Sequence, residues 1–124
     1  PLSFKDMCAK FDVPARTLRY YEYIELLQPQ KDGRARFYGN REIARMTLIL
    51  RGRRWGFSLE EIRQCLEIYE KQGTEPQLRE FVRLADRQLA ALAEERAALD
   101  DTIGDLERMR AEVTKSLNAL KSGK

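Results

Sequence analysis

One short segment, RTLRYYE at residues 16–22, carries side chains suited to contact with nucleic acid. In a helix with about 100° of rotation per residue, Arg16, Arg19 and Tyr20 lie within about 100° of one another. Leu18 points to another side, where it can pack on a neighbouring helix. Two guanidinium groups and a phenol on an exposed stripe suit phosphate contact and base-edge readout in a DNA major groove. The competing interpretation is a solvated face without a ligand.

Basic charge is concentrated in the first half of the chain. Residues 1–66 contain 13 Lys and Arg against 8 Asp and Glu, a net of +5, and residues 67–124 contain 10 against 12, a net of −2. The basic side chains outside residues 16–22 that stand out are Arg34, Arg36, Arg51, Arg53 and Arg54. This asymmetry indicates an anion-binding head on an interaction stalk, whereas charge alone also fits a solvated, mildly basic surface.

The remaining residues argue against catalysis and metal binding. The chain has no histidine, which removes the commonest general base and metal ligand. Acidic pairs such as Glu60 and Glu61 are adjacent on an expected helix, so they point about 100° apart and cannot share a site. Two cysteines, Cys8 and Cys65, are too few for a disulfide framework or a four-ligand zinc site. The simplest interpretation is that both are small residues of the core. We expect no enzyme, no cofactor and no metal.

The sequence also predicts the compartment. No run of about 18 apolar residues occurs, so no transmembrane helix is expected. The N-terminus lacks the charged and then apolar pattern of a signal peptide, which favours a cytoplasmic, reducing environment.

Two short helices are expected to hold the basic stripe. Ser3 followed by Asp6 is typical of a capping box and predicts a helix over residues 4–11. Asp12-Val13-Pro14 interrupts it, because the residue before a proline is pushed away from helical geometry. Proline suits the first turn of a second helix, over residues 14–24, which carries the stripe. Two helices joined by a tight turn form a helix-turn-helix unit.

A basic wing and two more helices follow. Residues 28–38 alternate in character around Asp32-Gly33, a turn signal, and predict a two-stranded ribbon. Apolar residues at helical spacing predict a helix over residues 41–54. Ser58 with Glu61 is a capping box for the next helix, which ends at Gln72-Gly73-Thr74.

From Leu78 onward, apolar residues repeat every 3.5 residues for almost six heptads. Eleven of thirteen such positions are apolar, and one long helix cannot bury this stripe on so small a head. It needs a partner, most simply another copy of itself. The residues expected to pair are Leu78, Val82, Leu89, Leu92, Leu99, Ile103, Leu106, Val113 and Leu117.

Three positions complicate this stripe. Arg96 and Arg110 stand where apolar residues are expected, and they either fix register or let their stems snorkel along the groove. Gly104 marks a bend, a close helix approach, or a break that turns the rod into a hairpin.

The first 70 residues resemble the MerR family of bacterial transcriptional regulators. Residues 16–22 are similar to its recognition-helix signature and IELL at 24–27 to the segment that follows. RFY at 36–38 is similar to its wing, and GFSLEEI at 56–62 to the start of its fourth helix. These motifs occur in the family's order and spacing over about 55% of the chain.

The resemblance implies roles for individual residues. It implies recognition-helix contacts for Arg16, Thr17, Arg19 and Tyr20, wing contacts to the DNA backbone for Arg36 and Tyr38, and a further basic contact for Arg54. The chain departs from the family at Asp12 and Pro14, where members often have glycine and a Ser or Thr cap. The geometry of that turn is therefore in question.

The resemblance also implies a mechanism. Such proteins dimerise through antiparallel long helices, bind near-palindromic promoters whose −35 and −10 elements are too far apart, and distort the DNA so that RNA polymerase can use it. An effector would bias two dimer shapes. No cysteine follows Cys65, so thiolate metal sensing is not expected, and no separate ligand-binding domain is expected. Residues 47–52 and the plain long helix are similar to those of a subgroup that regulates branched-chain amino-acid and fatty-acid catabolism. The activity of such a regulator could be controlled by an acyl-CoA-type effector or by the abundance of the protein alone.

The sequence therefore predicts an all-α fold with a small β wing. Residues 1–72 form a winged helix-turn-helix DNA-binding domain, and residues 73–124 form a long coiled-coil dimerisation helix with a short tail. The predicted function is a homodimeric DNA-binding transcriptional regulator. A DNA-architectural, excisionase-like protein without effector control is the alternative, and such a protein would not need the coiled coil.

Overall fold

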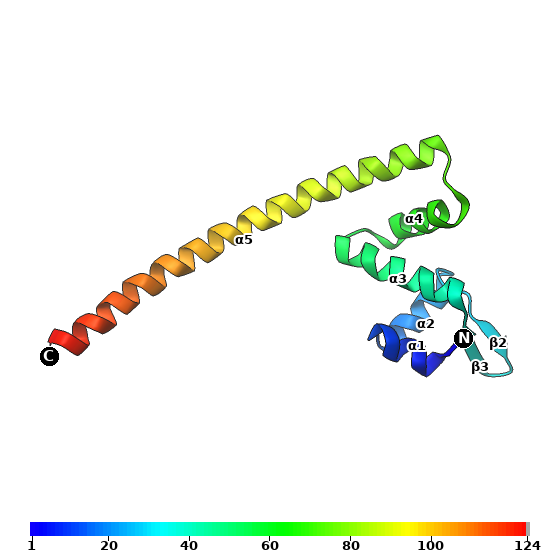
Figure 1. The fold of residues 1–124 in the computed structure, drawn as a ribbon, viewed down its shortest axis with the longest axis horizontal. Helices are drawn as coiled ribbons and strands as arrows, with labels where there is room; N and C mark the ends of the chain where they lie inside the picture. Colours follow the sequence, from blue (N-terminus) through cyan, green and yellow to red (C-terminus); the bar gives the residue numbers. More distant parts are fainter. Residues whose placement is uncertain (124) are drawn as a thin grey trace. The chain divides into compact units, whose positions relative to one another are not determined.

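The computed structural model describes residues 1–123, which form five helices and three short strands (Figure 1). In chain order the elements are β1 (Leu2–Ser3), α1 (Phe4–Phe11), α2 (Ala15–Tyr23), β2 (Gln30–Asp32), β3 (Ala35–Tyr38), α3 (Asn40–Trp55), α4 (Leu59–Lys71) and α5 (Glu75–Gly123). The predicted all-α fold with a small β wing and a long C-terminal helix is confirmed.

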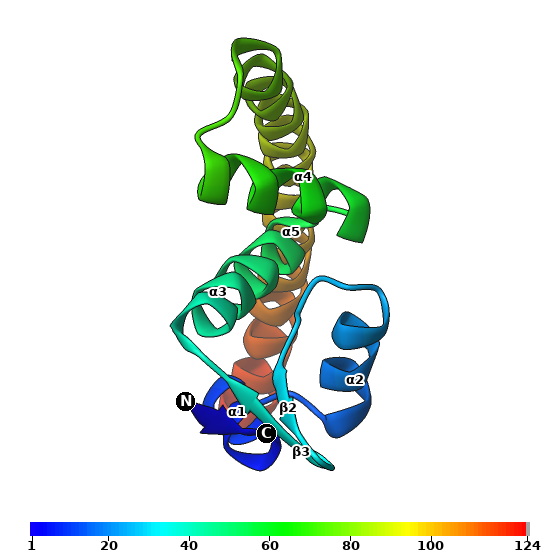
Figure 2. The same cartoon turned by 90° about the vertical axis from the view of Figure 1, so that its right-hand side faces the viewer.

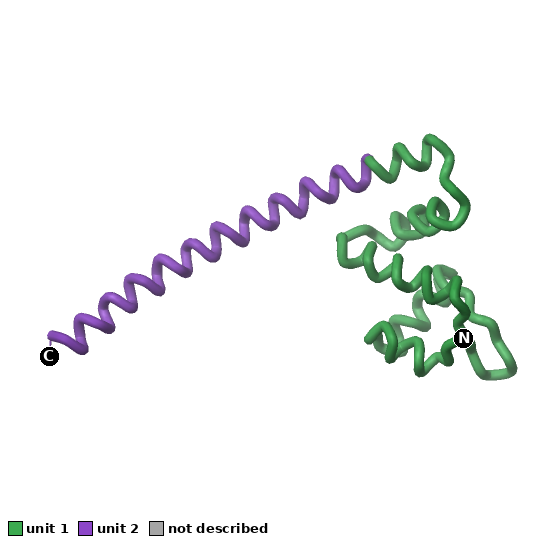
Figure 3. Tube along the Cα trace, viewed as in Figure 1, with its two compact units in different colours: residues 1–82 green, residues 83–124 purple. Residues whose placement is uncertain are grey.

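The chain divides into two compact units, the first comprising residues 1–82 and the second beginning at Arg83 (Figure 3). The first unit includes the first turns of α5. There the Phe81 ring meets the Phe57 ring edge-on, with centroids 6.2 Å apart.

The turn between α1 and α2 forms with Asp12-Val13-Pro14 and contains no glycine. Ser3 caps α1 by accepting a hydrogen bond from the Asp6 backbone N–H at 3.1 Å, as the capping pattern predicts. Asp12 adopts the left-handed conformation with φ 52°, which aspartate tolerates better than most residues. Pro14 precedes α2 as its N-cap, with φ −69° and ψ 156°, rather than lying in the helix. The helix-turn-helix geometry is therefore intact.

The wing belongs to a three-stranded antiparallel sheet in the order β1-β3-β2 (Figure 2). Lys31 pairs with Arg36 across the hairpin, and Gly33 provides the positive φ of 63° that its turn requires. The predicted two-stranded ribbon is confirmed. The third strand, β1, was not predicted, because Leu2–Ser3 is too short to show a period.

The core of the first unit lies between the helices and the sheet. Its fully buried side chains are Met7, Leu18, Leu26, Leu27, Tyr38, Met46, Ile49, Ile62 and Leu66. Helices α3 and α4 pack closely at Gly52, where an added Cβ would lie 2.7 Å from Ile62 Cγ1. A glycine is therefore required for these two helices to pack as they do.

A network of charged side chains ties α3 to α4. Arg45 Nη1 lies 2.6 Å from Glu70 Oε1, and Arg41 Nη1 lies 2.6 Å from Glu42 Oε1. Arg41 also reaches Glu70 Oε2 at 3.1 Å. Burial by itself would raise the pKa of Glu70, but Arg45 and Arg41 together hold it below its ordinary value. The carboxylate is therefore stabilised in its charged form.

The same side chains hold the loop that follows α2. Arg45 Nε donates to the Leu26 carbonyl oxygen at 2.8 Å, and a carboxylate oxygen of Glu42 accepts from the Gln28 backbone N–H at 3.0 Å. From α4, Arg63 donates to the Ile24 carbonyl oxygen at 2.5 Å. The C-terminal end of α2 is thus bonded to both α3 and α4.

Helix α5 is continuous from Glu75 to Gly123, 49 residues or about 74 Å. Gly104 lies inside it without breaking it, so the alternative of a helical hairpin is wrong. The large apolar residues of its predicted stripe are exposed in the single chain, from 37% at Leu92 to 77% at Leu120. None of the helices in residues 1–123 combines the length and hydrophobicity that a bilayer-spanning segment needs.

Candidate nucleic-acid interface

Helix α2 presents the predicted basic stripe at the surface. Leu18 is fully buried and Tyr21 is 7% exposed, so both pack inward. Arg16 and Arg19 are exposed, and Tyr20 is 48% exposed. The predicted separation of an inward apolar side from an outward basic side is confirmed, which places the three polar groups where a ligand can reach them.

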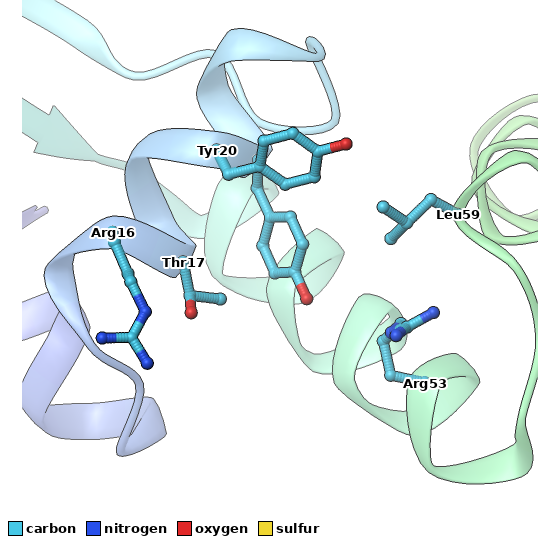
Figure 4. A pocket seen from close by; sticks show the side chains of 6 residues that line it. Arg16, Thr17, Tyr20, Arg53 and Leu59 are labelled. Atoms are coloured by element: carbon cyan, nitrogen blue, oxygen red, sulfur yellow. The ribbon is translucent and has the colours of Figure 1, made fainter.

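An open hollow of about 320 Å³ lies between α2 and the end of α3 (Figure 4). It is lined by Arg16, Thr17, Tyr20, Tyr21, Arg53 and Leu59. Two guanidinium groups therefore border one concave surface together with hydroxyl groups. Such donors suit the oxygens of a phosphate backbone.

Arg53, rather than Arg54, borders this hollow. Its Nη1 donates to the Phe57 carbonyl oxygen at 3.2 Å, which fixes the side chain against the turn after α3. Arg54 is exposed but does not line the hollow. Arg51 lies over the Trp55 ring, with Cζ 5.1 Å from the centroid. The resemblance implied a DNA contact for Arg54, and the sequence named Arg53 only as one member of a basic cluster. Neighbouring residues of a helix point about 100° apart, so the two arginines face different directions.

Tyr38 is fully buried, so its side chain does not lie at the wing surface, where a contact to the DNA backbone was expected. Its hydroxyl donates to a carboxylate oxygen of Glu22 on α2. Burial, followed by the hydrogen bond and charge of Glu22, raises the pKa of Tyr38 well above its ordinary value. The side chain thus supports the wing from within, because it packs in the core and bonds α2.

Two of the expected DNA contacts lie beside one aromatic ring. The Arg19 guanidinium carbon lies 5.3 Å from the centroid of the Phe4 ring, and that of Arg36 lies 5.4 Å from it. Arg36 Nε also lies 3.3 Å from Glu22 Oε1. Phe4 is the first residue of α1, so α1, α2 and β3 meet at this cluster of basic groups.

The two cysteines of the head, Cys8 and Cys65, are separate free thiols. Cys8 is half-buried and Cys65 is buried, both are free thiols, and burial raises the pKa of each. No cluster of three or more His, Cys, Asp or Glu side chains in residues 1–123 is placed to hold a metal ion.

A helix-turn-helix with a β hairpin beside it and a basic hollow along its second helix defines a winged DNA-binding head. Comparison with known families agrees. A family model described as MerR HTH family regulatory protein matches residues 2–68, and one described as MerR, DNA binding, matches residues 43–115. Each match covers more than half of the chain.

Individual relatives show the same relationship. The transcriptional regulator HmrR of Rhizobium leguminosarum is 33% identical over 97 residues, which cover 73% of this chain and 75% of that protein. The regulator PbrR691 of Ralstonia metallidurans, crystallised with lead(II), has a TM-score of 0.63 and 26% identity, over 87% of this chain and 86% of that one. HiNmlR, crystallised on promoter DNA, shares the fold with a TM-score of 0.62 and 23% identity, over 80% and 78%.

The chain therefore belongs to the MerR HTH family of regulatory proteins, and it is a DNA-binding transcriptional regulator. The family predicted from the motifs of residues 16–62 is confirmed. These comparisons do not distinguish a subgroup, so the resemblance to regulators of branched-chain amino-acid and fatty-acid catabolism stays a prediction.

Proposed function

We propose that this regulator binds a near-palindromic promoter site as a homodimer, with α2 entering the major groove and the wing lying along the backbone. The observation that carries the proposal is the hollow in which Arg16, Thr17 and Tyr20 of α2 face Arg53 of α3 (Figure 4). The promoter complex of HiNmlR, which has the same fold, supports it. In this arrangement phosphate contacts set affinity and register, and α2 reads base edges.

Each residue of the interface then has a role. Arg16, Thr17 and Tyr20 contact DNA from α2, and Arg53 binds a phosphate on the opposite side of the hollow. Tyr38 positions the wing from the core. Three further basic side chains lie outside the hollow and bind the flanking backbone: Arg19, Arg36 and Arg54.

The dimer forms through α5. The large apolar residues of its stripe are 37% to 77% exposed in the single chain, and they recur with the 3.5-residue period of a coiled coil. A two-fold axis with antiparallel helices brings the same stripe of two copies together. Arg96 and Arg110 interrupt the stripe, where they either set its register or lay their aliphatic stems along the groove.

Promoter distortion provides the regulation. A two-fold protein imposes its own half-site separation on the DNA, and the bent DNA presents the −35 and −10 elements to RNA polymerase, which thus responds indirectly. An effector acts by preferring one of two dimer shapes. Because bacterial promoters lie in the cytoplasm, the protein works there.

The test is binding of the purified full chain to a fragment of its own promoter region across a salt series. We expect a two-fold symmetric footprint and a steep loss of affinity with salt. The double variant Arg16→Ala with Arg19→Ala removes four basic groups per dimer and lowers the salt slope by about 3 to 4, at about 0.9 per phosphate contact.

The matched control is Arg79→Ala with Arg108→Ala, which removes the same charge from exposed positions on α5. This variant should keep the wild-type salt slope. Binding by the α2 variant with an unaltered slope would show that the recognition-helix assignment is wrong. Weak binding by the wild type that is indifferent to sequence would favour the DNA-architectural alternative.

A further inference from the structure

We propose that Glu22 is a positioning residue that fixes the wing against the recognition helix, so that selective DNA binding depends on an acidic side chain within a basic face. The inference rests on the proposed function and assigns a new role within the same interface. It comes from three groups that the structure brings together, namely the Glu22 carboxylate, the Tyr38 hydroxyl and the Arg36 guanidinium.

Both oxygens of the Glu22 carboxylate are used by one strand. One oxygen accepts the hydrogen bond from the Tyr38 hydroxyl, and the other lies 3.3 Å from Arg36 Nε. Arg36 and Tyr38 are two residues apart on β3, so their side chains lie on the same face of the strand. Glu22 is 13% exposed and lies near the end of α2. It thus bonds the recognition helix to the wing at two points.

This placement is opposite to what attraction for DNA alone would favour. A carboxylate among arginines repels phosphate and lowers the positive potential of the face. Yet Arg19 and Arg36 both lie within 5.4 Å of the Phe4 ring centroid, and two guanidinium groups that converge on one ring repel each other. Glu22 offsets that repulsion and keeps the Arg36 side chain in place. Its negative charge therefore serves to position the wing against α2.

Loss of the carboxylate would therefore have two opposing effects. The net positive charge of the face increases, which strengthens attraction for any DNA. At the same time Arg36 loses its ionic partner, and the buried Tyr38 hydroxyl faces a weaker acceptor. The wing then shifts relative to α2, and the two no longer fit one half-site together.

The test compares Glu22→Gln with Glu25→Gln in the full chain. Both variants remove one negative charge, but Glu25 is exposed and lies beyond the end of α2. Binding is measured to the promoter fragment and to a scrambled duplex of the same length. For Glu22→Gln we expect affinity for the promoter to fall about 10- to 100-fold, as the loss of a charge-assisted hydrogen bond implies, with equal or tighter binding to the scrambled duplex. For Glu25→Gln we expect both affinities to stay equal or rise together.

A second variant, Tyr38→Phe, tests the proposal if Glu22→Gln does not fold. It keeps the ring in the core and removes only the hydroxyl, and it should lower the ratio of promoter to scrambled affinity in the same direction. A merely structural role would lower both affinities together, in parallel with the loss of folded protein seen by circular dichroism.

The two proposals fail in different ways. If the wild type prefers the promoter and Glu22→Gln behaves like Glu25→Gln, the positioning role of Glu22 is wrong and the DNA-binding function stands. If the wild type shows no preference for the promoter over the scrambled duplex, the proposed function is wrong, and the role of Glu22 in selectivity fails with it.

Discussion

Replacement of Leu89 and Leu92 by aspartate is expected to separate the dimer without unfolding the head. The two residues are consecutive members of the apolar stripe on α5, 63% and 37% exposed in the single chain. Neither is among the buried residues that form the core of the first unit. Their exposed surface is therefore available only to a partner.

The exposed fractions give the size of the effect. Together they amount to one whole leucine side chain per chain, and so to two per dimer. Burial of a leucine side chain contributes about 1.5–3 kcal/mol, so the dimer loses about 3–6 kcal/mol. That loss raises the dissociation constant by about two to four powers of ten. Four aspartates placed in the seam add a desolvation cost, so this range is a lower bound.

Sedimentation equilibrium of the full chain measures the outcome. At micromolar concentration the variant should sediment as a 14.5 kDa monomer, while the wild type sediments at twice that mass. The matched control is Ala90→Asp with Ala97→Asp, which places the same charges at exposed positions outside the stripe. The control shares the helix-propensity cost of aspartate and should remain a dimer.

Two results would refute the reasoning. A folded dimer that survives both leucine substitutions would show that the stripe is not the interface. Dissociation of the control to the same extent would show that helix propensity or net charge, rather than apolar burial, determines assembly.

Three further predictions concern the stability of the chain, measured by urea denaturation. Gly52→Ala should destabilise the chain by about 1–3 kcal/mol, because the new Cβ would lie 2.7 Å from Ile62 Cγ1. Gly104→Ala should instead stabilise α5 by about 1 kcal/mol, because the nearest neighbour of its new Cβ would lie at 3.5 Å. Equal effects of the two variants would contradict the packing argument. The pKa of Glu70 is lower in the folded chain than its ordinary value of 4.5, so its ion pairs stabilise the fold fully above pH 4.5. This stabilisation is lost as the pH falls through the lowered pKa. Glu70→Gln should therefore make stability less dependent on pH in acid. Tyr38 keeps its proton in the folded chain, so stability should decline as pH rises above 10, and Tyr38→Phe should lessen that decline.

The helices of the head were predictable because their signals are local. The Ser3 and Ser58 caps lie within three residues of their partners. Ser58 and Glu61 form both hydrogen bonds of the capping box, whereas Ser3 makes one of the two, accepting from the Asp6 backbone N–H. The inward side of α2 followed from its period of 3.6 residues, which places Leu18 and Tyr21 together.

Features that depend on distant residues were not predictable. Arg45 and Glu70 are 25 positions apart, and Tyr38 and Glu22 are 16 apart, so no sequence window contains either pair. A tyrosine two residues after an arginine in a basic ribbon looks like a surface contact, and only the structure shows that the Tyr38 side chain lies in the core. Arg53 and Arg54 differ only in the direction in which they point from α3. Which of them borders the hollow can be decided only when α2 is known to lie beside the end of α3.

The hydrogen bonds that hold the loop after α2 have a consequence for the evolution of this regulator. Arg45, Glu42 and Arg63 bond residues 24–28 from α3 and α4, which ties the segment after α2 to the rest of the head. Each head of the proposed dimer then reads its half-site as one block, and the distance between half-sites depends on how two blocks are joined. In the proposed complex, base preference and operator spacing are separate inheritable traits: substitutions on the outer face of α2 are expected to alter the first, and substitutions along α5 the second.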